Sequence, residues 1–444
     1  MSILHHRSPI THYTLLFFIF IFFLLSFILF TACPESPNED ERDTTIYLEL
    51  EDTGIFTARM RVGVADTTDD WTFGLSRNDS IVLTATVTAL DTVLRDSGLT
   101  PATEYRYRAY WLEDGIAVDS SLEITAITGD TTSHAFTWVL DTLGESGVLH
   151  DVWAFDENNV WVVGEILPVA SETWNSYGAA VWDGEQWTLK KLEDGATNVR
   201  PRGVWAFSEE DIWFAAGSIF HWDGNEVSFE WVLPDINHGV YSLWGESFSN
   251  IYFVGDNGTI VHYDGSSFTK MESGTDLDLW YVTGSVDDYG EVRVWAGSPQ
   301  RILLFYDEES WMAVWDEAHP FYADSQYTST RGIWAPDNET LIVSVVGNNE
   351  RVYCHNQIDF ADYHLLSEQN EKYTFNIGGR AKNDFFMVGE FWTVYHYNGN
   401  STFQYDEISG FGRFRSVSQV GSNAFAVGEI FGIFGGPFVA RGVR

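Results

Sequence analysis

Arginine recurs at one position of a sequence repeat, and its chemistry is that of anion recognition. Lysine and arginine together number only 24 in a chain of 444 residues that carries 65 aspartates and glutamates. Arg202, Arg331 and Arg415 nevertheless each stand two residues before the same apolar position of the repeat. A guanidinium group binds a carboxylate or sulfate through paired hydrogen bonds and stacks on flat rings. The pattern therefore indicates either a site for an anionic group or a sugar, or a structural lattice of ion pairs.

Other polar and aromatic residues occupy this position and a second one beside it. In the remaining copies of the repeat the first position is held by His150, Tyr241, Leu277 and Phe375. The second position follows the glycine that ends the second strand, and its occupants are Glu165, Ser218, Asp256, Ser298, Asn348, Glu390 and Glu429. We expect both sets on one face, where arginine–carboxylate pairing is the simpler explanation and ligand binding is the alternative.

Two long loops at the second position add aromatic side chains. Residues 165–178 contain Trp174, and residues 429–436 contain Phe431 and Phe434. If exposed, these rings would suit a sugar or peptide site. If buried, they would plug the seam between the first and last copies.

The repeat that carries these positions fills residues 134–444. Seven copies align, at 150–165, 202–218, 241–256, 277–298, 331–348, 375–390 and 415–429. Each predicts a hairpin, and a second hairpin often follows, marked by Asp-Gly or Asn-Gly as in "AVWDGEQW" (180–187) and expected to form a type I′ turn. Four strands in roughly 40 residues is the spacing of propeller blades. We predict an all-β, seven-bladed β-propeller whose seventh blade is completed by residues 136–141, which closes the ring. Six or eight blades are the alternatives, because the copy at 277–298 is divergent.

Tryptophans recur on the same strands. Trp153 and Trp161 flank the turn of "VWAFDENNVWVVG" (152–164). Trp153 has counterparts in later copies, namely Trp205, Trp244 and Trp334. Recurrence in several copies predicts packing between neighbouring blades rather than contact with a ligand.

The repeat resembles that of bacterial extracellular propellers with the pattern "vW…nniwavG…i.hydG..W". The resemblance implies the fold and says little about function. The Gly-His and Trp-Asp pairs of WD repeats, the regular double glycines of kelch blades and the Asp-box of sialidases are all missing from the sequence.

A smaller β domain is predicted over residues 46–128. Its segments alternate with period two, which predicts short strands of an antiparallel sandwich. "GLTPATEYRYRA" (98–109) resembles the E–F corner of fibronectin type III domains, which implies that Tyr105 locks this corner through its hydroxyl group. Trp71 is the candidate core tryptophan. Such domains act as spacers or binding modules.

Metal, cofactor and nucleic-acid functions find no support. His221, His262 and His396 recur in separate copies, so they should lie too far apart to share a zinc ion and should pack within their blades. The sequence has no calcium loop, P-loop, dinucleotide fingerprint or hydrolase motif, so we expect no metal, no cofactor and no catalytic residue. A formal net charge of −41 would repel nucleic acid.

The N-terminal segment has the composition of a secretory signal. Residues 15–30 are apolar except for Ser26, and "TAC" (31–33) follows. This motif resembles the lipobox of bacterial lipoproteins, which implies a signal peptide over residues 1–32 and a lipid on Cys33. An uncleaved transmembrane anchor is the alternative. Residues 33–45 would form a flexible acidic tether, and Cys354, the second cysteine, is left without a disulfide partner.

Together these features predict a binding lipoprotein of the cell envelope, anchored at the outer membrane or cell surface. Its propeller face would bind a glycan or protein ligand. An extracellular polysaccharide hydrolase or lyase, with its site at the propeller mouth, is one alternative, because pairs of acids can be recognised only by their separation in space. A scaffold without a ligand site is the other.

Overall fold

The computed structural model describes residues 46–65, 70–173, 175–195, 197–231, 239–287, 290–315, 327–347, 350–357, 363–369, 373–432 and 435–444. The regular elements of these residues are β-strands and one 3-10 helix, η1 (Asp256–Gly258). The predicted signal peptide, Cys33 and the tether lie outside the described residues, as do Trp174 and Phe434. No helix among the described residues has the length and apolarity needed to cross a bilayer.

The chain forms two compact units. Among the described residues, the first unit comprises 46–52, 59–95 and 105–126, and the second comprises the rest. The strands of residues 46–127 form two sheets. One has the order β1 (Ile46–Thr53), β2 (Thr57–Val64), β5 (Asp91–Ser97). The other has the order β4 (Ser80–Val87), β3 (Trp71–Arg77), β6 (Glu104–Glu113), β7 (Ile116–Ser120), and β8 (Ile124–Ile127) also pairs with β6.

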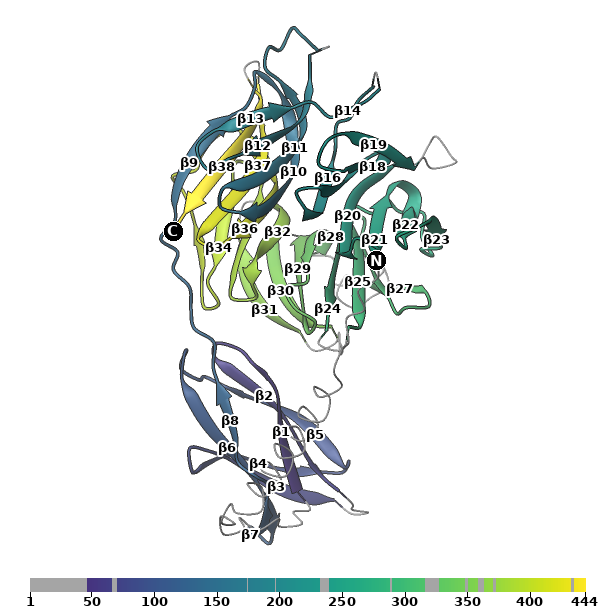
Figure 1. The fold of residues 1–444 in the computed structure, drawn as a ribbon. Coiled ribbons are helices and arrows are strands. Elements are labelled where there is room, and N and C mark those ends of the chain that lie inside the picture. Colours follow the sequence, from purple (N-terminus) through teal and green to yellow (C-terminus); the bar gives the residue numbers. More distant parts are fainter. Residues whose placement is uncertain are drawn as a thin grey trace, which may run out of the picture. The chain divides into compact units, whose positions relative to one another are not determined.

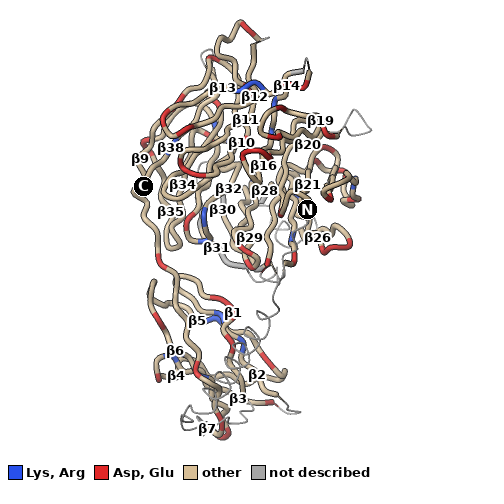
Figure 2. The backbone as a smooth tube through the Cα atoms, in the orientation of Figure 1, with Lys and Arg blue, Asp and Glu red and all other residues tan. Residues whose placement is uncertain are grey.

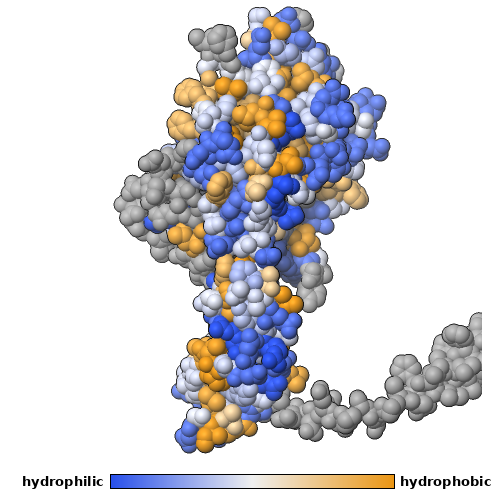
Figure 3. All heavy atoms as spheres, turned by 90° about the vertical axis from the view of Figure 1, so that its left-hand side faces the viewer, coloured by the Kyte–Doolittle hydropathy of each residue, from blue (hydrophilic) through white to orange (hydrophobic). Residues whose placement is uncertain are grey.

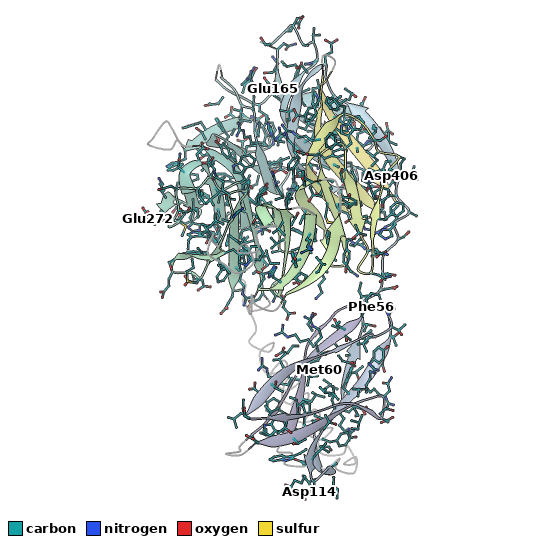
Figure 4. All side chains as sticks on the ribbon, turned by 180° about the vertical axis from the view of Figure 1, so that it is seen from behind. Phe56, Met60, Asp114, Glu165, Glu272 and Asp406 are labelled. Atoms are coloured by element: carbon teal, nitrogen blue, oxygen red, sulfur yellow. The ribbon has the colours of Figure 1, made fainter. Side chains whose placement is uncertain are left out.

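Period-two alternation builds the core of these two sheets, because successive side chains of a strand point to opposite faces. Trp71, Phe73 and Leu75 alternate along β3 and are at most 2% exposed. Met60 on β2 is fully buried (Figure 4). The indole Nε1 of Trp71 donates to the carbonyl oxygen of Ala89 at 2.7 Å, so the polar edge of this ring is satisfied. Trp71 is thus a core residue, as predicted.

In the second unit, the described residues form seven four-stranded antiparallel sheets and a two-stranded ribbon, β14 (Glu193–Asp194) with β15 (Thr197–Asn198). The first two sheets are β10 (Ser146–Asp156), β11 (Asn159–Leu167), β12 (Tyr177–Trp182), β13 (Trp187–Lys190), and β16 (Gly203–Ser208), β17 (Asp211–Ala216), β18 (Ser218–Trp222), β19 (Val227–Trp231). The third and fourth are β20 (Val240–Ser247), β21 (Asn250–Gly255), β22 (Ile260–Tyr263), β23 (Phe268–Met271), and β24 (Tyr281–Val286), β25 (Val292–Ser298), β26 (Ile302–Tyr306), β27 (Trp311–Trp315). The fifth and sixth are β28 (Tyr327–Trp334), β29 (Thr340–Gly347), β30 (Glu350–Asn356), β31 (Tyr363–Gln369), and β32 (Thr374–Ala381), β33 (Asp384–Gly389), β34 (Val394–Tyr397), β35 (Thr402–Gln404). The seventh is β36 (Gly412–Val420), β37 (Asn423–Ile430), β38 (Pro437–Val443), β9 (Thr137–Thr142).

The first strands of the seven sheets form a closed ring (Figure 1). Each contacts the first strand of the next sheet, in the order β10, β16, β20, β24, β28, β32, β36, and β36 contacts β10 again. Apolar clusters fill the space between neighbouring sheets; Trp161 of the first sheet, for example, packs with Phe214 and Trp222 of the second. Side chains between the sheets therefore hold the ring together, with help from isolated backbone bridges such as that of Gly217 with Val240.

Tryptophans of the first strands form part of this packing. Trp153 and Trp161 face each other across β10 and β11 in register. The Trp153 ring lies 4.4 Å from the Trp205 ring, centroid to centroid, and Trp205 lies 6.2 Å from Trp244. The predicted role of these residues in packing between successive sheets is confirmed.

The Asp-Gly hairpins are present, but their turns differ from the prediction. The loop between β12 and β13 has four residues, and Gly184 has a φ of +95° while Asp183 does not have a positive φ. The Asp183 carboxylate instead accepts hydrogen bonds from the backbone N–H groups of Glu185 and Gln186. A type I′ turn would require a positive φ at both central residues, so the aspartate acts here as a side-chain cap of a longer loop.

The seventh sheet is completed from the N-terminal side of the chain, as predicted. Strand β9 pairs antiparallel with β38, with Asp141 opposite Val439. The Asp141 carboxylate accepts hydrogen bonds from Arg441 Nε of its own sheet and from Trp187 Nε1 of the first sheet. The Arg441 guanidinium also lies over the Trp182 ring, 4.0 Å from its centroid. Asp141 therefore ties the last sheet to the first.

Candidate ligand-binding mouth

The predicted site residues that the structure describes lie at one end of the ring, where the first strands begin; we call this end the mouth. Five of the residues at the first position of the repeat stand at β-bulges. One extra residue interrupts the pairing of first and second strands in five of the sheets, and these residues are His150, Tyr241, Arg331, Phe375 and Arg415. A bulge leaves its extra residue out of the ladder and turns its side chain away from the normal alternation. Local backbone geometry thus delivers one side chain per sheet to the mouth.

Three guanidinium groups lie near enough to His150 for their charges to act on it. Burial, together with the positive charges of Arg415, Arg202 and Arg413, lowers the pKa of His150 to about 3. The imidazole is therefore neutral at physiological pH. Arg413 was not among the residues predicted for the site; it stands two positions before Arg415 on the same strand.

The acids at this position neutralise only part of the positive charge. Glu429 Oε1 accepts hydrogen bonds from Arg413 Nε at 2.6 Å and from Arg415 Nη2 at 2.9 Å, so two guanidiniums share one carboxylate. Burial affects the pKa of Arg415 more than the charge of Glu429 does, and it lowers this pKa. Within the described part of the chain, Arg202 has no ion pair; it is exposed and lies over the Tyr241 ring, 4.5 Å from the centroid.

The remaining acids have other partners. Glu165, at the end of β11 (Figure 4), pairs with Arg200 at 3.1 Å rather than with a residue of the predicted ring. Asp256 accepts a hydrogen bond from the Tyr241 hydroxyl, and burial together with this bond raises the pKa of Tyr241 to about 12. Glu390 lies beside Arg413 through a backbone bridge. The predicted arginine–acid lattice therefore holds for Arg415 and not for Arg202.

Arg331 lies apart from this cluster. Its guanidinium is 5.6 Å from the centroid of the Phe375 ring in the next sheet, and its Nε is buried without a hydrogen-bond partner among the described residues. The structure therefore brings His150, Arg202 and Arg415 together and places Arg331 with Phe375.

The divergent fourth copy contributes a residue that the sequence alignment missed. Val282 pairs with Ala296 as Val204 pairs with Phe214, so the aligned position is Val282 and not Leu279. Leu279 is instead fully buried before the strand begins. The counterpart of Arg202 is therefore Trp280, whose side chain is 49% exposed. The backbone N–H of Trp280 donates to the carbonyl oxygen of Gly297, as that of Arg202 donates to the carbonyl oxygen of Ala215. Residue types alone could not have shown this equivalence.

Asp151 joins the cluster to the centre of the ring. Its carboxylate accepts a hydrogen bond from the backbone N–H of Val204 at 3.0 Å and from the Ser416 hydroxyl at 2.6 Å. These partners belong to the second and seventh sheets. In the same way, the side-chain Oδ1 of Asn376 accepts a hydrogen bond from the backbone N–H of Val417 at 3.3 Å. Such contacts satisfy the free inner edges of the first strands.

The three recurrent histidines each pack against a ring of their own sheet, as predicted, and His396 also contacts His134 and Phe136. His221 stacks on Trp213 at 4.4 Å, His262 on Tyr252 at 4.6 Å and His396 on Phe386 at 4.7 Å, between ring centroids. Each also bonds to a residue at the start of the second strand, and these residues are Asp211, Asn250 and Asp384. The described residues contain no group of three or more His, Cys, Asp or Glu side chains able to hold a metal ion.

Comparisons with known proteins identify the fold of the second unit. No protein-family model and no curated protein matches the chain. Among solved structures, YCF48 bound to D1 peptide is 13% identical, with a TM-score of 0.54 over 71% of this chain and 100% of that one. The WD40 β-propeller domain of Doa1 is 14% identical, with a TM-score of 0.51 over 70% and 98%. YCF48 from Cyanidioschyzon merolae is 12% identical, with a TM-score of 0.51 over 69% and 98%. The second unit is a β-propeller.

At these identities the similarity establishes the fold alone. A fold alone does not indicate a function, which depends on the residues of the site. Its mouth carries arginines, a neutral histidine and aromatic rings, which can hold an anionic group by charge-assisted hydrogen bonds. Two acids of the mouth, Glu165 and Glu429, are occupied by arginines.

Proposed function

We propose that the chain is a lipid-anchored, extracytoplasmic binding protein whose propeller mouth holds a carboxylate of a protein ligand. The observation that carries this proposal is the placement of Arg202, Arg413 and Arg415 near a neutral His150, with a single shared carboxylate between the latter two arginines. Burial of a cation without full charge compensation, as at Arg415, is costly unless a ligand supplies the missing charge, and the exposed Arg202 is accessible to such a ligand.

The setting of the cluster strengthens this proposal. The chain has a formal net charge of −41, and Figure 2 shows acidic residues spread over both units. A local cationic cluster in such a field would attract an anionic group while the surrounding surface repels highly acidic molecules. A protein ligand is favoured over a glycan because one propeller of similar fold is described as bound to a peptide.

The proposed architecture is a seven-bladed propeller preceded by a fibronectin type III-like sandwich. In support, each of the seven sheets would be one blade, and β9 would seal the last blade to the first. The sheet orders β1-β2-β5 and β4-β3-β6-β7, together with the buried Trp71, fit a fibronectin-like sandwich. This domain would serve as a spacer.

Binding is tested with Arg202→Ala in a chain that begins at residue 46. We expect the variant to bind peptides that carry a free carboxylate at least about tenfold more weakly than the wild type does, because a charge-assisted hydrogen bond is worth about 1.5–3 kcal/mol. Peptide arrays identify the ligand and fluorescence polarisation measures its affinity. Arg106→Ala, at an exposed arginine of the small unit, is the matched control. Equal binding by the two variants would refute the arginine mouth.

Anchoring is tested separately with Cys33→Ser. The proposal expects wild-type protein to incorporate labelled fatty acid and to sediment with membranes. The variant should incorporate none and should no longer carry a lipid. Labelling that persists in Cys33→Ser would contradict lipidation at this residue.

A further inference from the structure

Exposed apolar side chains are scattered over the surface (Figure 3), and singly they need no explanation. Three phenylalanines, however, stand together at the mouth. Phe391 follows β33, Phe411 precedes β36 and Phe431 follows β37, and their side chains are 49%, 64% and 37% exposed. We call these three residues the phenylalanine shelf.

The shelf is continuous with the arginine cluster. The Phe411 and Phe431 rings are 5.4 Å apart between centroids, and the Arg413 guanidinium lies 5.5 Å from the centroid of Phe431. Backbone hydrogen bonds join the three segments, from Phe431 N to Phe411 O and from Phe391 N to Gly412 O, both at 2.8 Å. The Phe411 and Phe431 rings and the Arg413 guanidinium therefore form one surface, and the backbone of Phe391 is bonded to the segment beside it.

The turn that presents Phe391 has an unusual backbone. Phe391 and the following Trp392 have φ values of +54° and +57°, in the left-handed region that side chains other than glycine rarely adopt. Thr393 holds the turn, since its Oγ1 donates to Glu390 O at 2.6 Å. Trp392 is anchored inward, with its ring 4.5 Å from the Phe438 centroid. Packing thus accounts for Trp392, whereas Phe391 is held out toward solvent.

The geometry of the rings favours an apolar side chain over a sugar. Phe411 and Phe431 meet at 79°, so they make the walls of a corner rather than a flat platform. Their rings carry no polar group that could bond to sugar hydroxyls. A bulky apolar side chain can fill such a corner by edge-to-face contact.

Resting on the proposed function, we propose that the shelf and the arginine cluster together bind the C-terminus of a peptide, with its free carboxylate at Arg413 and a bulky apolar side chain on the phenylalanines. A single carboxylate next to apolar residues is favoured over an acid-rich segment, because the chain's own net charge of −41 would repel several acids at once. The ligand class is therefore an apolar peptide C-terminus.

The test uses the whole chain and three labelled peptides that differ only at the last residue, read by fluorescence polarisation. The sequence Gly-Ser-Gly-Ser is followed by phenylalanine with a free acid, serine with a free acid, or phenylalanine amide. We expect the phenylalanine acid to bind at least tenfold tighter than either of the others. Phe411→Ser should bring the ratio of phenylalanine acid to serine acid close to one and leave the affinity for serine acid unchanged. Phe248→Ser, at a side chain 66% exposed in the β20–β21 turn, should change neither.

The outcomes separate this inference from the proposed function. If Arg202→Ala weakens both acids while Phe411→Ser leaves their ratio intact, the shelf is overturned and the anion-binding mouth stands. If the amide binds as tightly as the acid and Arg202→Ala has no effect, the carboxylate-binding mouth is overturned, and with it the assignment of a C-terminus. Failure of the phenylalanine acid to bind at millimolar concentration overturns the inference, and an acidic oligosaccharide then tests the mouth independently.

Discussion

The carboxyl group of Asp151 links three sheets of the propeller through hydrogen bonds to Val204 and Ser416. Burial raises its pKa to about 6, against an ordinary value of 3.8, and the hydrogen bonds oppose this shift only in part. Between these two pH values the folded chain keeps a proton that the unfolded chain has released. Stability should therefore be greatest at the acidic end of this range and fall as the pH rises from about 4 to about 6.

Asp151→Asn tests this coupling, because an amide keeps a hydrogen-bond acceptor and does not titrate. The free energy of unfolding of the wild type, relative to that of the variant, should fall by up to about 3 kcal/mol between pH 4 and pH 7. Urea denaturation at a series of pH values measures both chains, and the difference cancels the contributions of all other titrating groups. A difference that does not vary with pH would contradict the raised pKa.

The residue types of the mouth were predictable, but their grouping was not. Arg202 and Arg415 could be found from the repeat, since each copy offers one residue at the position. The bulge at Arg415 and its neighbour Arg413, which both bond to Glu429, place two guanidiniums where one was expected. Trp280 was missed because the fourth copy has a loop that buries Leu279 before the strand starts. Such features depend on backbone register rather than on residue identity.

At the scale of the hairpin, one of the described turns has an unfavourable backbone conformation. Gly184, Gly224 and Gly265 occupy a left-handed position after the capping aspartate, with φ between +86° and +95°. The fourth sheet has Glu308 there, with a φ of +72°. A residue with a Cβ is strained in this region, whereas glycine is not.

Glu308→Gly should therefore stabilise the chain by about 0.5–1 kcal/mol, which is the strain relieved less the entropy that glycine adds to the unfolded state. The midpoint of urea unfolding provides the measurement. The converse change, Gly265→Ala, should destabilise, because it adds strain and brings a Cβ against Ser249. If Glu308→Gly lowered the stability, the contacts of the Glu308 side chain or the entropy of the unfolded chain would outweigh the relief of backbone strain.

Hairpins and inter-sheet tryptophans were the elements that the sequence specified best. Period-two patterns and the aromatic repeat sufficed to predict them, because each depends on residues close together in the chain. The type of the Asp-Gly turn was wrong, since local sequence does not distinguish a two-residue turn from a four-residue loop closed by the Asp183 carboxylate.

At the scale of the whole molecule, the ring is closed by contacts between distant segments, and Asp141 makes two of them. Asp141 bonds to Arg441, 300 residues away, and also to Trp187 of the first sheet. Pairing of β9 with β38 was predictable, because the last copy of the repeat lacked an outer strand and an unmatched strand preceded the first. The ligand was not predictable, because the fold serves many functions.

Asp141→Ala should lower the free energy of unfolding by about 1–3 kcal/mol, since it leaves Arg441 and Trp187 Nε1 without their acceptor. Urea unfolding followed by tryptophan fluorescence provides the measurement. Glu272→Ala, at an exposed acid of the third sheet (Figure 4), is the control and should change stability by less than about 0.5 kcal/mol. Equal effects of the two substitutions would mean that this seal contributes nothing.

The pairing of β9 with β38 also sets the order in which the molecule can form. During synthesis from the N-terminus, β9 emerges about 300 residues before its partner. It remains unpaired, and can pair with a strand of a neighbouring chain, until residues 437–443 have been synthesised. Such distant pairing is slow to form. A ribosome that stops before these residues would thus release a chain with six complete sheets, an unpaired β9 and a β37 without its outer neighbour.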